Sequence, residues 1–222
     1  MQKLILILLF SFTVSTCFNA TANDAISPKF PSESELLYNK MKLNDTIDYE
    51  LFRLAFNGYK KVKDKRKSIL TLVDFNKPST EKRFYVIDME QERLLYTTHV
   101  AHGKNSGGDV ATQFSNRSGS FQSSLGFYLT SNTYQGRNGY SLRLQGLEAG
   151  INDRAMSRAI VIHGAPYANP SVIPSLGRLG RSLGCPALPQ EVSKEVIDTI
   201  KEGALLFIYS KTADYTHKSE LI

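Results

Sequence analysis

The segment 158–188 constrains the fold of this chain more than any other part of the sequence. It begins with a short apolar run, 159–162, which predicts a strand, and His163 and Gly164 follow at the end of that strand. A loop rich in proline and glycine comes next, and the segment closes on Ser-Leu-Gly-Cys-Pro at 182–186. A histidine at the end of a strand and a cysteine in a glycine turn are the components of a thiol nucleophile and its base. The fold must bring them together, because 22 residues separate them in sequence.

The N-terminus predicts an export signal over 1–22. Lys3 supplies a positive charge, 4–12 is an apolar run, and Ala-Thr-Ala at 20–22 is suited to signal peptidase. The apolar run is too short to span a membrane, so we expect no transmembrane span in the mature chain and a location in the periplasm or cell envelope. Cys17 leaves a less favoured alternative open, because the residues before it loosely resemble the lipobox of a lipid-anchored protein.

Removal of the export signal leaves Cys185 as the single cysteine of the mature chain. A lone thiol in an oxidising compartment forms no internal disulfide and is exposed to oxidation. The alternative interpretation is a buried structural cysteine, which is common because cysteine packs as a small apolar residue. Gly184 and Pro186 place Cys185 in a turn, and this context favours a functional thiol.

Hydrophobic periodicity predicts an α+β chain that is mainly β. An N-terminal helical extension is expected over 23–67, with one helix beginning at Ser32 and a second over 48–63. A catalytic domain follows over 68–210, and 211–222 reads as a polar tail. Within this domain we expect strands at 69–75, 84–89, 94–101, 127–131, 140–145 and 204–209, a connection at 134–139, and one helix after the cysteine over 189–202.

Composition limits the partners of the chain. The 27 basic and 21 acidic residues give a net charge of +6, which favours an acidic partner such as a polyanionic envelope polymer. The densest basic group, 60–67, reads as a solvated helix face and turn, so nucleic-acid binding is not expected. One mature cysteine and four scattered histidines show no metal-ligand spacing, so we expect neither a metal nor another cofactor. The protein is expected to be a monomer.

Several segments together resemble the L,D-transpeptidase catalytic domain, the YkuD-type family that cross-links peptidoglycan. The His-Gly pair at 163–164 and the Ser-x-Gly-Cys motif at 182–185 carry the likeness, which extends over about 68–210. The wider surroundings resemble one branch, the murein L,D-transpeptidase catalytic-domain-like proteins. Matching segments of that branch are 103–107, 114–116, 124–128, 140–144, 162–164 and 180–187.

The resemblance implies a YkuD-like β-sandwich catalytic domain in which Cys185 is the nucleophile and His163 its base. The family also implies that a backbone carbonyl, here that of Gly164, holds the base in one tautomer. Gly184 allows close approach of the substrate, and amides at 183–185 are placed to stabilise an oxyanion. The hydroxyl of Ser182 is expected to brace this turn.

Two positions depart from the family pattern. Many members have histidine where this chain has Leu183, which leaves His163 as the base. Many also have arginine where this chain has Ala187, so another residue must anchor the substrate carboxylate. For each candidate the alternative is an exposed solubilising charge, and the candidates are Arg181, Arg143 and Arg158.

Three functions follow as hypotheses. The first is an L,D-transpeptidase, in which a Cys185 thioester forms with release of D-Ala and an amine of a second stem peptide resolves it into a 3→3 cross-link. The second is an L,D-carboxypeptidase or another stem-peptide hydrolase that uses water as the acceptor. The third is a non-catalytic wall-binding protein of the cell envelope.

Overall fold

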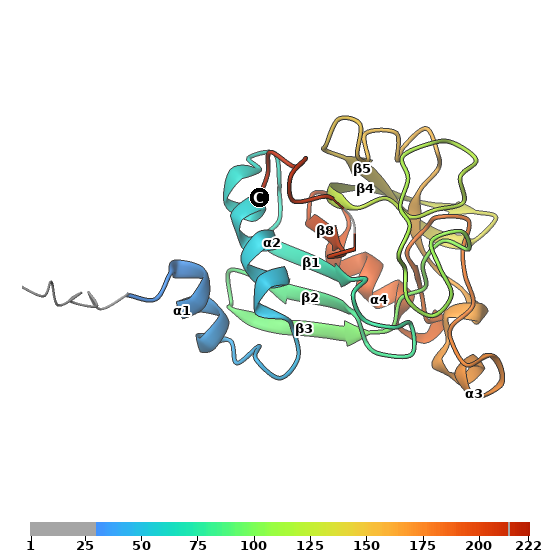
Figure 1. The fold of residues 1–222 in the computed structure, drawn as a ribbon, viewed down its shortest axis with the longest axis horizontal. Helices are drawn as coiled ribbons and strands as arrows, with labels where there is room; N and C mark the ends of the chain where they lie inside the picture. Colours follow the sequence, from blue (N-terminus) through green and yellow to red (C-terminus); the bar gives the residue numbers. More distant parts are fainter. Residues whose placement is uncertain (1–29, 213) are drawn as a thin grey trace, which may run out of the picture. The chain divides into compact units, whose positions relative to one another are not determined.

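Apolar segments in the C-terminal two thirds of the chain build a mixed eight-stranded sheet, and the residues of β1, β2 and β8 are buried almost without interruption (Figure 1). The protein is described by a computed structural model over residues 30–212 and 214–222, and the export signal expected at 1–22 lies outside this range. Residues Ser32–Ile222 form one compact unit. In this described part, no helix has the length and apolar character needed to cross a membrane.

The strand order places β8, the last strand in sequence, near the centre of the sheet. The order is β3-β2-β1-β8-β4-β5-β6-β7, and only the β1–β8 and β6–β7 pairs are parallel. The hydrogen bonds join all strands into one sheet, and the α+β, mainly β, class is confirmed. The strands are β1 (Ile69–Asp74), β2 (Phe84–Asp88), β3 (Arg93–Thr98), β4 (Gly126–Gly136), β5 (Gly139–Gly146), β6 (Val161–Gly164), β7 (Ala187–Leu188) and β8 (Leu205–Tyr209).

The hairpin of β4 and β5 is longer than the sequence predicts. A connection was expected over 134–139, and this is wrong, because pairing continues to Gly136 opposite Gly139. The aromatic and β-branched residues near its end keep the strands paired. The turn is therefore formed by Arg137 and Asn138, and Gly139 adopts a φ of +73° that favours glycine.

The helices begin where the sequence places side-chain caps. Helix α1 (Glu33–Lys40) begins at Ser32, whose hydroxyl accepts the Glu35 amide hydrogen. Helix α2 (Tyr49–Lys61) begins after Asp48, whose carboxylate accepts the Leu51 amide hydrogen. The loop after β6 contains two 3₁₀ turns, η1 (Pro166–Ala168) and η2 (Pro170–Val172), and the short helix α3 (Ile173–Leu176), and helix α4 (Gln190–Ile200) follows β7.

Helices α2 and α4 cover opposite faces of the sheet. A Cβ added to Gly58 of α2 would meet the ring of Phe127, whereas the hydroxyl of Thr130 on the same strand donates to Ile200 O at the end of α4. Residues an odd number of positions apart on a strand face opposite sides. Figure 1 accordingly shows α2 in front of β1 and α4 behind the sheet. The two helices seal the hydrophobic core on both sides.

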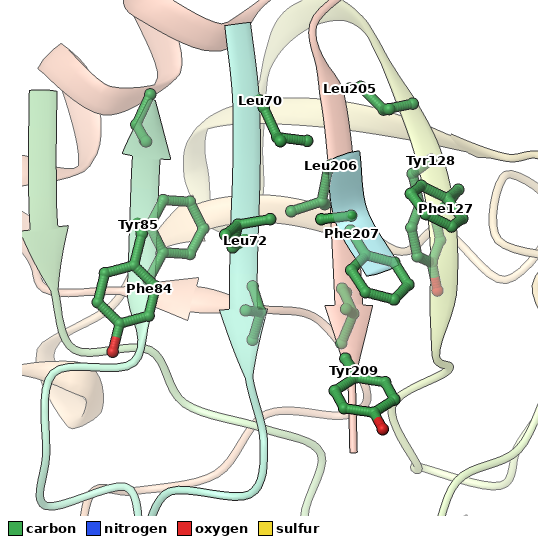
Figure 2. Packing of buried hydrophobic residues seen from close by; sticks show 14 of the residues in the cluster. Leu70, Leu72, Phe84, Tyr85, Phe127, Tyr128, Leu205, Leu206, Phe207 and Tyr209 are labelled. Atoms are coloured by element: carbon green, nitrogen blue, oxygen red, sulfur yellow. The ribbon is translucent and has the colours of Figure 1, made fainter. Parts of the chain in front are cut away.

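Aromatic and aliphatic side chains of β1, β2, β4 and β8 fill much of this core (Figure 2). The rings of Phe127 on β4 and Phe207 on β8 stack with their centroids 4.2 Å apart. Buried residues of α2, such as Phe52, belong to the same cluster. This packing fixes β8 between β1 and β4. Strands β5, β6 and β7 continue the sheet beyond β4, so the core also sets their position.

Candidate active site

Parallel pairing of β6 with β7 brings the two chemically distinctive residues of the sequence together. The register sets His163 of β6 opposite Ala187 of β7, and Cys185 lies two residues before Ala187. His163 also pairs with Ser141 of β5 on its other side. The strand pairing therefore closes the 22-residue separation between the histidine and the cysteine.

The segment 101–104 clamps the loop that carries Cys185. Ala101 and Ala187 exchange backbone hydrogen bonds, with N···O distances of 2.8 and 3.3 Å. The Ser182 amide donates to His102 O at 2.9 Å, and the Lys104 amide donates to Ser182 O at 2.8 Å. Both ends of the segment 182–187 are thus fixed by main-chain contacts.

A buried arginine stabilises the start of the segment 101–104 through hydrogen bonds. Arg83 is fully buried and donates through Nε and Nη2 to Val100 O at 3.1 and 2.9 Å. Its Nη2 also donates to Nδ1 of His102 at 2.8 Å. Burial, reinforced by Arg83, lowers the pKa of His102 to about 4, and burial lowers the pKa of Arg83 to about 9. His102 is therefore a neutral structural residue, and it does not line the cleft described below.

Cys185 lies at the base of the site, and the residue is only 9% exposed. The Val161 amide donates to Sγ at 3.5 Å, and the thiol lies 3.7 Å from Ala159 O, to which it donates. Burial raises the pKa of this thiol, and the Val161 amide and the Arg158 charge oppose the shift. Ala159 itself has a φ of +53°, a strained backbone conformation for a residue with a side chain.

His163 is held in one orientation by its own neighbour. Its Nδ1 lies 3.0 Å from Gly164 O, so Nδ1 donates to this carbonyl and Nε2 is left as the acceptor. Burial lowers the pKa of His163, and the contact with Gly164 O opposes this. The ring of Tyr167 contacts the imidazole edge to face, with centroids 6.5 Å apart. A neutral imidazole with a free Nε2 is the form that takes up a proton.

The turn before Cys185 requires glycine and serine at their positions. Gly184 has a φ of +126°, and a Cβ there would lie 2.9 Å from Gln122 O. The Ser182 hydroxyl donates to Cys185 O at 2.6 Å and accepts the Gly184 amide hydrogen at 3.0 Å. The Gly184 amide is thus occupied, whereas no acceptor among the described residues contacts the amides of Leu183 and Cys185.

An open cleft of about 410 Å³ lies over Cys185. Leu183 lies at this cleft with 61% of its surface exposed. No group of three or more histidine, cysteine or acidic residues in the described ranges is placed to hold a metal ion. The cleft is lined by Arg137, Asn138, Arg158, Ala159, Ile160, His163, Tyr167, Arg181, Ser182, Leu183 and Cys185.

The arginines expected at the site are placed unequally. Arg158 and Arg181 line the cleft, whereas Arg143 does not and instead stacks its guanidinium on the Tyr134 ring at 4.1 Å. The sequence interpretation missed Arg137 and Tyr167, which also line the cleft. The Gly-x-x-Gly pattern at 136–139 predicts a turn. It does not predict that Arg137 lies at the cleft, because this depends on how far β4 and β5 extend.

Comparison with models of known protein families identifies a match. The sequence model of the family described as "L,D-transpeptidase catalytic domain" matches residues 43–209. No curated protein sequence matches the chain significantly.

The solved structures that match this chain share little sequence with it. An L,D-transpeptidase from Mycobacterium smegmatis is 13% identical with a TM-score of 0.42, over 64% of this chain and 59% of that chain. L,D-transpeptidase 3 from Mycobacterium tuberculosis is 12% identical with a TM-score of 0.41, over 64% and 61%. The helical cell shape determining protein Pgp2 from Campylobacter jejuni is 15% identical with a TM-score of 0.44, over 69% and 53%.

This chain spans less than two thirds of each of those three structures. The family match, in contrast, covers most of the chain, from residue 43 in the loop before α2 to residue 209 at the end of β8. The chain therefore belongs to the L,D-transpeptidase catalytic-domain family of enzymes.

Proposed function

We propose that this protein is an L,D-transpeptidase that forms 3→3 cross-links in peptidoglycan through a Cys185 thioester. The observation that carries the proposal is the shared cleft of Cys185 and His163, with Nδ1 of His163 tied to Gly164 O. This arrangement leaves Nε2 to accept the thiol proton, as a general base must.

The first half-reaction transfers an acyl group to sulfur. Sγ of Cys185 attacks the carbonyl between the L-centre of the diamino acid and the terminal D-Ala of a tetrapeptide stem, and its proton passes to Nε2 of His163. The amides of Leu183 and Cys185, which have no acceptor among the described residues, are suited to stabilise the oxyanion. The C–N bond then breaks, and His163 returns the proton to the departing D-Ala amine.

The second half-reaction releases the acyl group. An amine of a second stem peptide attacks the thioester carbonyl and gives its proton to His163. The C–S bond breaks, and the sulfur of Cys185 recovers the proton. Because the same groups act in both directions, no further acid or base is required.

The substrate requires an extracytoplasmic enzyme. Peptidoglycan stems lie outside the cytoplasmic membrane, so we infer that the protein is exported by the signal at 1–22. The charge of +6 supports association with an acidic envelope polymer.

Mass spectrometry of the reaction products tests the proposal. The purified protein is incubated with a disaccharide-tetrapeptide, with Cys185→Ala and His163→Ala as controls. A dimer that has lost one D-Ala, absent from both controls, is the expected result. A tripeptide without a dimer would assign the carboxypeptidase reaction instead, and binding without any product would assign a wall-binding protein.

A further inference from the structure

The cleft over Cys185 is cationic. Three arginines line it, and none of its described lining residues is acidic. A guanidinium binds a carboxylate through two parallel hydrogen bonds, which makes such a cleft suited to a substrate with a carboxylate near the attacked bond. The three arginines differ in whether their donors are available.

Two of the arginines are engaged by the protein itself. Arg158 donates through Nη1 to Ser115 O at 2.8 Å and through Nη2 to Gln122 O at 2.7 Å. Arg181 donates through Nη1 to Lys104 O and Gly107 O, at 3.1 and 2.8 Å. Both terminal nitrogens of Arg158 are occupied by backbone carbonyls, whereas Arg181 is tied to the loop through Nη1 alone, so a substrate carboxylate would compete with backbone carbonyls fully at Arg158 and partly at Arg181.

The guanidinium donors of Arg137 are available to a ligand. It is exposed at the tip of the β4–β5 hairpin and lines the cleft together with Cys185. Within residues 30–212 and 214–222, its guanidinium has no hydrogen-bond acceptor, no carboxylate within salt-bridge distance and no aromatic ring beneath it. The two paired glycines, Gly136 and Gly139, fix the turn that holds Arg137 at this rim.

We infer that Arg137 is the specificity-determining residue that binds the terminal carboxylate of the acyl donor. The inference rests on the proposed function for the identity of the donor, in which the D-Ala carboxylate lies one residue beyond the attacked carbonyl. Arg137 supplies the anchor that the family places two residues after the cysteine and that Ala187 lacks in this chain. Because this contact is made equally in the ground state and the transition state, it acts on KM and leaves kcat unchanged.

Binding measurements in the Cys185→Ala background test the inference without requiring turnover. Isothermal titration compares a synthetic tetrapeptide stem that ends in D-Ala carboxylate with the same peptide ending in D-Ala carboxamide. We expect the carboxylate form to bind about tenfold more tightly, and Arg137→Ala to reduce this preference to below about twofold. Arg137→Lys should retain part of the preference because it keeps the charge but loses the planar fork.

Arg93→Ala is the matched control, since Arg93 is an exposed arginine of β3 outside the cleft and should leave the preference unchanged. Equal binding of the two peptides in the Cys185→Ala protein, or a preference that survives Arg137→Ala, would overturn the inference. Failure of both peptides to bind would overturn it as well. An Arg137-dependent preference without any product from the active protein would instead refute the proposed function, and only the carboxylate-binding role of Arg137 would remain.

Discussion

The thiol of Cys185 and the imidazole of His163 are both neutral in the resting site. Burial raises the pKa of the thiol and lowers the pKa of the imidazole, so both shifts oppose a thiolate–imidazolium pair. Sγ instead lies between the Val161 amide and Ala159 O. In the proposed mechanism, transfer of the proton to His163 therefore accompanies the attack on the substrate.

This electrostatic state predicts how the alkylation of Cys185 depends on pH. The rate of reaction with iodoacetamide should rise continuously with pH and reach its midpoint above the value of about 8.5 for a free thiol. The sign follows from burial, because a raised pKa delays formation of the reactive thiolate to higher pH. Stopped-time alkylation followed by mass spectrometry measures it on protein that lacks residues 1–22, in which Cys185 is the single cysteine. A rate plateau between about pH 5 and pH 8 would contradict the account, because it indicates a preformed ion pair.

The sequence predicts the cleft residues of the motif at 182–186 better than it predicts the other cleft residues, such as Arg137 and Tyr167. Ser182 and Cys185 stand in one local motif and His163 ends an apolar strand, and the structure places all three at the same cleft. Arg143 does not reach the cleft, because Tyr134 across the hairpin provides a ring on which its guanidinium stacks. The position of Arg137 depends on strand lengths and register, which are set by pairing between distant residues and not by local pattern.

At the scale of elements, the strands are predictable but their order is not. The apolar patterns locate β1, β2, β8 and α4 to within a few residues. The insertion of β8 between β1 and β4 is a long-range pairing that leaves no signal in the sequence of either strand. Strand β7 was missed for a similar reason, because two residues are too short to give a pattern.

Contact between α2 and β4 gives a prediction at this scale. Gly58→Ala should destabilise the fold by about 1–3 kcal/mol, because the new Cβ would lie 2.1 Å from the ring of Phe127. That ring is fully buried and stacked on Phe207, so it has little room to move. The gain of about 1 kcal/mol in helix propensity is too small to offset the overlap. Urea denaturation measures the change.

Asn57→Ala is the control for that measurement, since Asn57 is the adjacent, partly exposed helix position and its side chain makes no hydrogen bond within the described residues. We expect Asn57→Ala to leave the free energy of unfolding unchanged or slightly higher. A Gly58→Ala protein as stable as Asn57→Ala would show that the interface between α2 and β4 is looser than described.

At the scale of the whole molecule, the C-terminal segment is packed onto the domain. The sequence predicts a polar tail at 211–222, yet Tyr215 is only 3% exposed. Its hydroxyl lies 3.1 and 3.0 Å from the carboxylate oxygens of Glu148, which also accept the Phe127 amide hydrogen at 2.6 Å. Burial raises the pKa of Glu148, and the hydrogen bonds from Ser219, the Phe127 amide and Tyr215 oppose this shift. The hydrogen bonds that satisfy the buried Glu148 carboxylate therefore attach the C-terminal segment to the domain.

Tyr215→Phe should therefore lower the free energy of unfolding by about 1–3 kcal/mol, because it removes hydrogen bonds to a buried carboxylate. The phenyl ring keeps the apolar contacts of the tyrosine, so the loss reports on the hydroxyl. His217→Ala changes an exposed position whose partner among the described residues is the exposed Asp214, and it should change stability by less than about 0.5 kcal/mol. Equal stability of the two variants in urea denaturation would contradict a structural role for the Tyr215–Glu148 contact.

The most direct test of the account is the mass of the intact protein during turnover of a disaccharide-tetrapeptide. We predict a covalent adduct equal to the stem acyl group without its terminal D-Ala, located on Cys185 by peptide mapping and absent from Cys185→Ala. His163→Ala should form the adduct much more slowly, because the thiol then has no base. Turnover by Cys185→Ala, or an adduct that maps to another residue, would contradict the assignment of Cys185 as the nucleophile.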